Sequence, residues 1–345
     1  MQANAVADPP QRPHFYMMKN SQIIPTTLPT TPSSPAVIGV DVASKHLDAA
    51  TYASNGVVRF NNTDAGVAKW LRTLPAGSVI ALESTGRYHE RLALAAHAKG
   101  FTVYLLNPRD VRHYARAMGM RGKTDRLDAQ ILARYAAHER AELRAWVPLS
   151  PELSRLDELV RRRGMLVKHQ GAMKQSALDC AELRALIKPL LAGFTKVLDA
   201  MDGKIAQAAA DVNLDSEGFE RITSVPGIGL LSGSVLLGLF QRLAQRGSDA
   251  VIAFLGLDPR PMDSGQKVGR RRLSKRGPAE SRRLLFNAAM SASRTKAWKP
   301  QYEHERAKGL SRIAALNVLA RKMVRVAFGL FKSHQHFDPA KIAMA

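Results

Sequence analysis

The sequence predicts an α/β domain followed by a long helical region and a second, mostly helical domain. Three observations predict this order. Short apolar runs alternate with helix-like segments over residues 36–146, and apolar residues recur at helical spacing over 147–214. A loop rich in glycine, proline and arginine lies between helical segments of 215–335. A chain of 345 residues is long enough for two domains, each with its own core.

The first 35 residues have the composition of a disordered segment. Seven of them are proline, and many others are serine or threonine. Such a segment buries too little apolar surface to offset the entropy lost on folding, so we expect no fixed structure in residues 1–35.

Residues 36–146 alternate strand and helix patterns. We expect strands at 37–43, 47–53, 57–62, 78–85 and 101–107, and helices at 64–74, 88–100, 108–118 and 124–138. Asp64 is expected to cap the first helix and Thr124 the last. This order is that of a ribonuclease-H-like domain. Right-handed crossovers would place its first and fourth strands side by side.

Four acidic residues fall at positions that this topology brings together. Asp41 interrupts the first apolar strand, Glu83 ends the fourth, and Asp125 and Asp128 open the last helix of the domain. Residues three apart share one face of a helix. Each acid alone is more simply explained as a structural residue, because unpaired buried charge is costly. Together they predict a carboxylate site for Mg²⁺ or Mn²⁺ and phosphate-ester chemistry.

Residues 147–214 predict two long helices packed as a hairpin. The first begins at Ser150-Pro151, an N-cap followed by proline. An apolar stripe marks the second, in which a dimerising coiled coil is the alternative. The stripe consists of Leu183, Leu186, Leu190, Phe194, Val197, Met201 and Ile205.

The C-terminal domain opens with a pattern similar to a helix-hairpin-helix. Two apolar helical halves of residues 222–240 flank PGIG, whose Gly227 and Gly229 would expose backbone N–H groups to a DNA phosphate. A loop and a helix from about Ala279 follow. The loop holds Ser264, which by its local sequence alone is an ordinary turn residue before glycine.

The charge of the chain favours a nucleic acid as partner. The formal net charge is +22 and the pI is about 10.5. A ribosomal or membrane-surface protein is the alternative, although the acids lie in apolar segments rather than in a solvated tail. The basic side chains expected to contact nucleic acid are Arg87, Arg109, Lys123, Arg270, Arg271, Arg272, Lys275 and Arg276.

Several other classes of protein fit the sequence poorly. One cysteine, Cys180, cannot form a disulfide or a cysteine-based zinc site within one chain, and suits a reducing compartment. The histidines lack paired ligand spacing, and no P-loop motif is present. Neither a signal peptide nor a membrane-spanning apolar run of about 18–20 residues is seen, so a cytoplasmic protein is expected.

Five segments together resemble the DEDD transposases of insertion sequences, relatives of the Piv DNA invertase that are described as bridge-RNA-guided recombinases. The resemblance covers nearly all of residues 36–335, and the KTDRLDA run and the GLDPRP–SG–G–RRLSKRG run are its most specific parts. The segments are GVDVASKHLDAATY (39–52), ALESTGRYHERLA (81–93), LLNPRDVRHYARAMGMRGKTDRLDAQILARYA (105–136), VPGIG (225–229) and FLGLDPRPMDSGQKVGRRRLSKRGPAESRRLLFNAA (254–289).

This resemblance implies a RuvC-like domain in which Asp41, Glu83, Asp125 and Asp128 bind divalent metal. It also implies a C-terminal transposase domain whose serine nucleophile maps onto Ser264. Cleavage would pass through a phosphoserine link to DNA, dimers or tetramers would form, and a structured noncoding RNA would choose the DNA sites. Two other readings stay open: a hydrolytic, junction-resolving nuclease in which water attacks, and a nucleic-acid-binding protein without catalysis.

Overall fold

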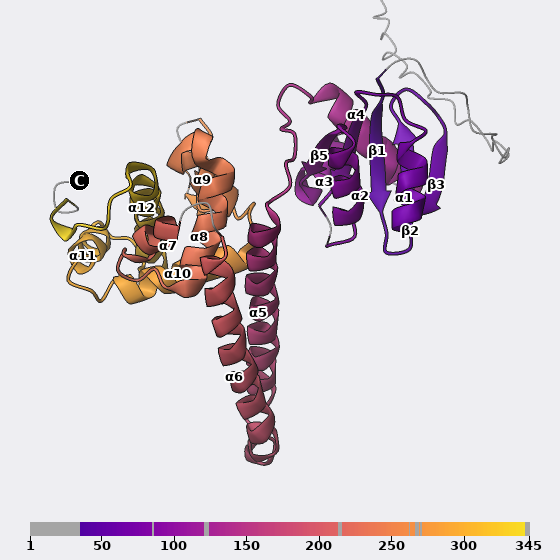
Figure 1. Cartoon of the computed structure of the whole chain (residues 1–345). Coiled ribbons are helices and arrows are strands. Elements are labelled where there is room, and N and C mark those ends of the chain that lie inside the picture. The colour runs from indigo at the N-terminus through magenta and orange to yellow at the C-terminus, as the bar shows by residue number, and fades with distance from the viewer. Residues whose placement is uncertain are drawn as a thin grey trace, which may run out of the picture. The chain divides into compact units, whose positions relative to one another are not determined.

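The computed structural model describes residues 35–84, 86–120, 124–212, 216–261, 263–265, 269 and 271–341. The chain divides into two compact units, Met1–Pro148 and Leu149–Ala345 (Figure 1). Residues 1–34, for which disorder is expected, lie outside the described residues. Within the described part, no helix is both long and apolar enough to cross a membrane.

The first unit is built on one five-stranded sheet with strand order β3-β2-β1-β4-β5. The central strand β1 is antiparallel to β2 and parallel to β4, so the predicted neighbourhood of the first and fourth strands is confirmed. The strands are β1 (Val37–Val42), β2 (His46–Thr51), β3 (Val57–Asn61), β4 (Val79–Glu83) and β5 (Thr102–Leu106).

Helices cover both faces of this sheet, because alternate strand residues point to opposite sides. Ile38 and Val40 of β1 belong to the core beneath α1 and α2. Val79 and Ala81 of β4 belong to a second core beneath α3 and α4. The helices are α1 (Asp64–Leu71), α2 (Glu90–Ala98), α3 (Pro108–Ala117) and α4 (Asp125–His138).

One glycine lets α4 lie directly on the central strand. A Cβ atom at Gly39 would lie 2.2 Å from the backbone oxygen of Ala129 and the backbone nitrogen of Ala133. Any side chain there would push the helix off the sheet. As predicted, Thr124 caps α4, and its hydroxyl accepts a hydrogen bond from the Leu127 amide at 3.2 Å. Gly39 and Asp41 lie on the same face of β1, so α4 covers the face that carries Asp41.

The expected cap of α1 is wrong by one residue. Thr63, not Asp64, is the N-cap, because its extended backbone lets its hydroxyl accept from the Gly66 amide at 3.1 Å. Asp64 is the first helical residue, and its carboxylate pairs with Arg91 at 2.8 Å.

The second unit begins with the predicted helical hairpin, formed by α5 (Pro151–Ser176) and α6 (Ala181–Ala210) (Figure 1). Ser150 caps α5 and Pro151 is its first residue, as predicted. The expected stripe is only partly buried, because one partner helix covers a narrower arc than these residues span. Ile205 is fully buried, whereas Leu186, Leu190 and Val197 are 77%, 53% and 49% exposed.

The rest of the second unit packs six helices around one apolar core that includes Phe240, Trp298 and Leu319. The helix expected from about Ala279 begins at that residue. A further division of this unit into linker and C-terminal domain remains a prediction. Its elements are α7 (Ser216–Thr223), α8 (Leu230–Leu243), α9 (Gly247–Leu255), β6 (Pro259–Arg260), β7 (Arg272–Leu273), α10 (Ala279–Ala292), α11 (Lys299–Ala307) and α12 (Arg312–Ser333).

Candidate active site

The carboxyl ends of β1 and β4 and the first turn of α4 carry the four acids of the first unit. Val40 pairs with Leu82 in the parallel β1–β4 ladder, so the residues that follow, Asp41 and Glu83, lie side by side on the same face. Asp125 and Asp128 lie in the first turn of α4.

The pKa of Asp41 shows that these acids act on one another. It is raised from 3.8 to about 6, first by burial and then by the negative charges of Asp128, Asp125 and Glu83. A hydrogen bond from the Val42 backbone opposes this rise. Like charges act in this way when carboxylates share one site. The structure therefore brings the four acids together around Asp41, and a bound cation would relieve their repulsion.

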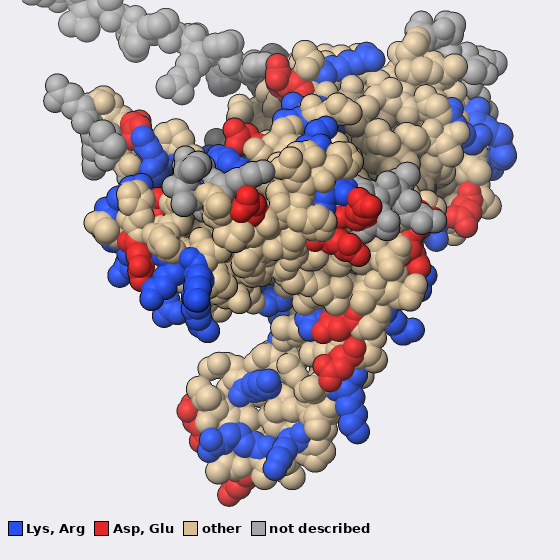
Figure 2. All heavy atoms as spheres, turned by 60° about the vertical axis from the view of Figure 1, so that its left-hand side comes forward, with Lys and Arg blue, Asp and Glu red and all other residues tan. Residues whose placement is uncertain are grey.

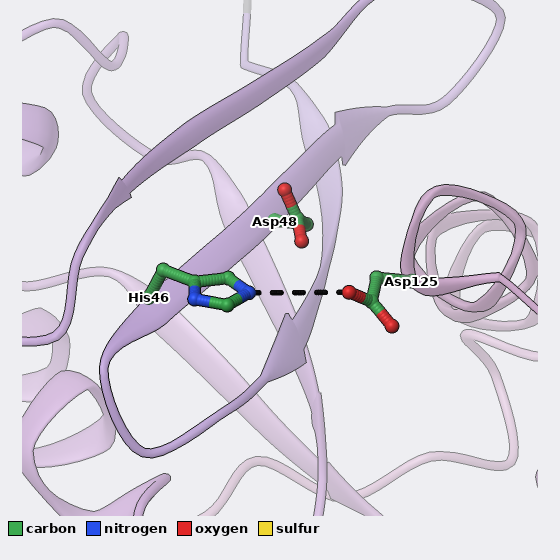
Figure 3. A group of neighbouring side chains, drawn as sticks. All are labelled: His46, Asp48 and Asp125. Atoms are coloured by element: carbon green, nitrogen blue, oxygen red, sulfur yellow. Dashed lines mark ion pairs between the residues drawn. The ribbon is translucent and has the colours of Figure 1, made fainter.

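Three further side chains join this site, and they come from β2 and β3. Asp48 stands opposite Asp41 in the β1–β2 ladder and opposite Arg59 in the β2–β3 ladder. His46 lies two residues before Asp48 and therefore on the same face of β2. Figure 3 shows His46 and Asp48 on one strand, facing Asp125 at the start of α4.

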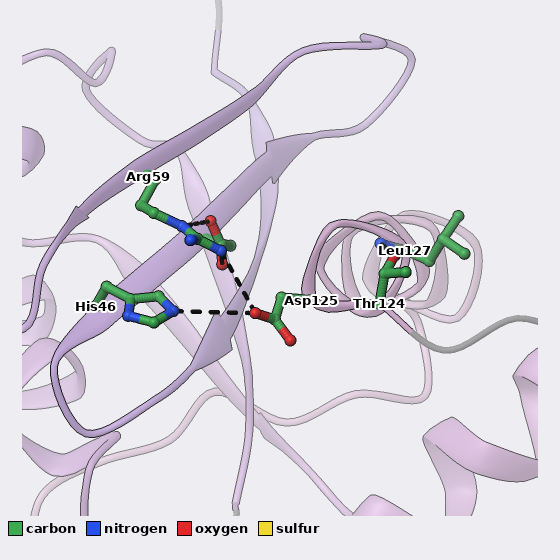
Figure 4. Close-up of polar contacts among 6 residues, drawn as sticks. His46, Arg59, Thr124, Asp125 and Leu127 are labelled. Carbon is green, nitrogen blue, oxygen red and sulfur yellow. Dashed lines mark hydrogen bonds and ion pairs between the residues drawn. The ribbon is translucent and has the colours of Figure 1, made fainter. Parts of the chain in front are cut away.

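Arg59 connects two of these acids. Its Nε and Nη2 atoms donate to the two oxygens of Asp48, each at 2.8 Å. The same Nη2 lies 3.4 Å from Oδ2 of Asp125, and His46 Nε2 lies 3.9 Å from that oxygen (Figure 4). The sequence did contain a signal for this cluster: Asp48 interrupts an apolar strand, as Asp41 does.

The donor set of the site fits a hard divalent cation. Carboxylate oxygens predominate around Asp41, which suits Mg²⁺ or Mn²⁺. Ligand atoms of His46, Asp48 and Asp125 also lie within 4.8 Å of one another, a spacing that one ion can bridge. The acids can therefore hold a metal, while Arg59 already supplies positive charge at one side.

Ser264 belongs to the second unit, in the loop between β6 and β7. Its side chain is exposed, and Gly265 after it has a left-handed φ of 55°. Next to Ser264, Asp263 accepts hydrogen bonds from the Gly269 amide at 2.9 Å and from Arg271 at 2.6 Å.

The predicted basic contacts have different environments. Arg271 is paired with Asp263, and Arg87 lies 3.6 Å from Glu90. Arg272, Lys275 and Arg276 are exposed, and the Arg109 amide donates to the cap of α3. Lys123 and Arg270 lie outside the described residues. Lysine and arginine side chains form several groups on the surface shown in Figure 2.

Gly227 and Gly229 lie between α7 and α8, as the helix-hairpin-helix pattern predicts, but they differ in role. Gly227 has a φ of 96°, and a Cβ there would lie 2.7 Å from the Ala288 backbone oxygen, so it is needed for packing. Gly229 is the N-cap of α8 and has open space around it. Both line a cleft of about 460 Å³ that Arg163 and Arg283 also line.

Comparison with known families decides what this arrangement belongs to. Residues 38–185 match the model of the IS110 DEDD transposases, and residues 219–304 match the model of the IS116/IS110/IS902 transposase family. The chain belongs to the IS110 family of transposases. The four acids lie in the first matched region, and Ser264 lies in the second.

Relatives of this transposase agree with that assignment. It is 26% identical over 324 residues to the pilin gene-inverting protein of Moraxella bovis, covering 88% of this chain and 98% of the relative. It is 27% identical over 226 residues to the transposase of insertion sequence IS1111A from Coxiella burnetii, covering 56% of this chain and 60% of the relative. The protein is a DNA recombinase of the transposase type.

Proposed function

We propose that this transposase cuts and rejoins DNA with a metal-binding acidic site in a ribonuclease-H-like first domain and a serine nucleophile in the second. The observation that carries the proposal is the convergence of Glu83, Asp125 and Asp128 on Asp41, whose pKa is raised by burial and then by these charges. A strand pair and a helix N-terminus hold these acids on one face of the sheet. The repulsion within such a cluster destabilises the fold unless a bound cation balances the negative charge.

The acids Asp41, Glu83, Asp125 and Asp128 would hold one or two Mg²⁺ or Mn²⁺ ions. A metal held by these acids would polarise the phosphodiester and would stabilise charge on the leaving oxygen. The residues of the chain supply the rest: β1 and β4 fix two carboxylates on a rigid sheet, and Gly39 lets α4 bring the other two close.

Ser264 would attack the phosphorus atom of the cleaved strand. The bond from its Oγ to phosphorus forms as the bond from phosphorus to one sugar oxygen breaks. The serine proton leaves to solvent or a nearby base, and the released sugar oxygen takes up a proton to become a hydroxyl. Attack by a sugar hydroxyl of another strand then reverses the step and frees Ser264. Because the phosphodiester energy stays in the covalent link, rejoining needs no ATP.

The basic side chains would hold the nucleic-acid backbone. Arg272, Lys275 and Arg276 are exposed next to the loop of Ser264, where contacts to phosphates would position the strand. The cleft beside Gly229 offers the N-terminus of α8 together with Arg163 and Arg283, a setting that suits a second phosphate. Arg87, Arg109, Lys123, Arg270 and Arg271 complete the proposed contacts.

A structured noncoding RNA would choose the DNA sites by base pairing, as the resemblance to guided recombinases implies. The net charge of +22 supports two nucleic-acid partners of this kind. Sequencing of RNA that co-purifies with the protein tests this part. A single structured RNA, encoded beside the gene, is expected; random cellular RNA would contradict it.

Dimers or tetramers would let the acids of one chain meet the serine of another. The acids belong to the first unit of the chain and Ser264 to the second. Complementation tests both the roles and the assembly. Asp41→Asn and Ser264→Ala should each be inactive in DNA recombination. A mixture of the two variant proteins should regain activity. Full activity of either variant alone would contradict the proposal.

A further inference from the structure

Arg59 forms the end of a row of charged residues that crosses three strands. The row runs from Arg59 on β3 through Asp48 on β2 to Asp41 on β1, each residue paired directly with the next. All three side chains lie on the face that α4 covers. The guanidinium of Arg59 is thus part of the same layer as the acidic site.

Asp48 gives Arg59 a fixed position. The carboxylate side chain of Asp48 is only 5% exposed, and its two oxygens accept the paired Nε and Nη2 hydrogen bonds. A two-point contact between guanidinium and carboxylate sets orientation as well as distance. Arg59 itself is 59% exposed, so the rest of its side chain is open to solvent.

From that position Arg59 reaches Asp125. Its Nη2 lies 3.4 Å from Oδ2 of Asp125, the oxygen that His46 also faces. Oxygen and nitrogen atoms of His46, Asp48 and Asp125 lie within 4.8 Å of one another, which is a cation-binding arrangement. The positive group that contacts two of these three residues is the guanidinium of Arg59.

We propose that Arg59 is a positioning residue of the acidic site: its guanidinium takes the place of a cation between Asp48 and Asp125. Arg59 thereby confines metal binding to the side of the site that carries Asp41. Asp125 is then held between the guanidinium of Arg59 and the metal ion proposed at Asp41. The inference rests on the proposed metal site around Asp41. While Arg59 is present, the group of His46, Asp48 and Asp125 binds no ion of its own.

Counting bound Mn²⁺ tests this directly. The full chain, freed of nucleic acid and metal, is titrated with Mn²⁺, and free ion is followed by electron paramagnetic resonance. Arg59→Ala should bind one Mn²⁺ more per chain than the parent, because the guanidinium no longer fills the site. Arg59→Lys should keep the parent number, since it keeps the charge. An unchanged number and affinity in Arg59→Ala would overturn the proposal.

Three further variants make the result specific. Asp48→Asn combined with Arg59→Ala should lose the gained ion, while Arg91→Ala, which breaks an ion pair with Asp64 elsewhere in this unit, should gain none. If Arg59→Ala does not fold, Arg59→Gln replaces it, because its amide still bonds to Asp48 without charge. An additional bound ion in Arg59→Gln would support the proposal, and the absence of an additional ion would contradict it.

The activity of the loaded enzyme gives a second readout. DNA cleavage by Arg59→Ala should fall about 10- to 100-fold, the usual effect of removing a side chain that orients a metal ligand. Asp41→Asn separates this inference from the proposed function. If Asp41→Asn binds as much Mn²⁺ as the parent, and as tightly, the proposed metal site around Asp41 is wrong, whatever Arg59→Ala shows.

Discussion

Asp41 and Asp48 face each other across β1 and β2, yet their charges are balanced in different ways. Two hydrogen bonds from Arg59 compensate the charge of Asp48 within the chain. Asp41 is surrounded by three other acids, and its pKa is raised to about 6. These adjacent carboxylates thus have separate roles: Asp48 fixes the position of an arginine, and Asp41 lies in a negative environment that favours binding of a cation.

The raised pKa of Asp41 predicts how the protein without metal responds to pH. The pKa of Asp41 is about 6 in the folded chain and 3.8 in the unfolded chain, so ionised Asp41 opposes folding at pH 7 and above. The destabilisation fades as pH falls from about 6 towards 4. Allowing for solvent screening of this partly exposed group, it amounts to about 1–2 kcal/mol.

Asp41→Asn should therefore stabilise the metal-free protein at pH 8 but much less at pH 4.5. Urea unfolding of parent and variant at several pH values measures the difference, and Asp64→Asn serves as a control carboxylate outside the acid cluster. A constant difference across this range would show that Asp41 is not perturbed.

Divalent metal should bind more tightly above pH 6 than below it, because a carboxylate must lose its proton before it binds a metal. Mn²⁺ at a few times its Kd should raise the Tm of the parent at pH 8 and much less at pH 5. Glu83→Gln and Asp128→Asn should reduce this rise. An equal shift in these variants would place the ion elsewhere.

The grouping of the four acids was predictable from the sequence, because apolar strands rarely contain carboxylates and residues three apart share one face of a helix. The strand order grouped Asp41 with Glu83, and the start of the last helix added Asp125 and Asp128. Arg59 was missed, because its role depends on which residue of β2 it faces, and pairing register follows from the whole sheet. The cap at Thr63 was missed for a local reason: both Thr63 and Asp64 are good caps, and only the backbone angle decides.

Gly227 and Gly229 should respond differently to the same substitution. Gly227→Ala places a Cβ against the α10 backbone at a left-handed φ, and should lower the free energy of unfolding by about 2–3 kcal/mol. Gly229→Ala meets open space and should cost at most about 1 kcal/mol through the weaker cap. Chemical denaturation of both variants measures this, and equal losses would contradict the packing described for Gly227.

Arg272 and Lys275 should contact phosphates rather than bases. Replacing both by Gln should weaken DNA binding across unrelated sequences and lower the salt slope by about one unit per lost contact. Arg161→Gln with Arg162→Gln on α5 removes the same charge from residues that already pair within their helix. If the salt slope of DNA binding stayed as in the parent, or fell equally in the control pair, Arg272 and Lys275 would be solvent-exposed residues that do not contact DNA.

Ser264 should become covalently linked to DNA, and only with the help of the four acids. The most direct measurement uses the full protein, its guide RNA, Mn²⁺ and a DNA substrate nicked so that the cleaved strand cannot be rejoined. We expect a protein–DNA species that survives SDS and is lost on protease treatment, and mass spectrometry should find the nucleotide on Ser264. Ser264→Ala and Asp41→Asn should form none, although both still bind DNA. Cleavage without any adduct, or an adduct on another residue such as Ser274, would contradict it.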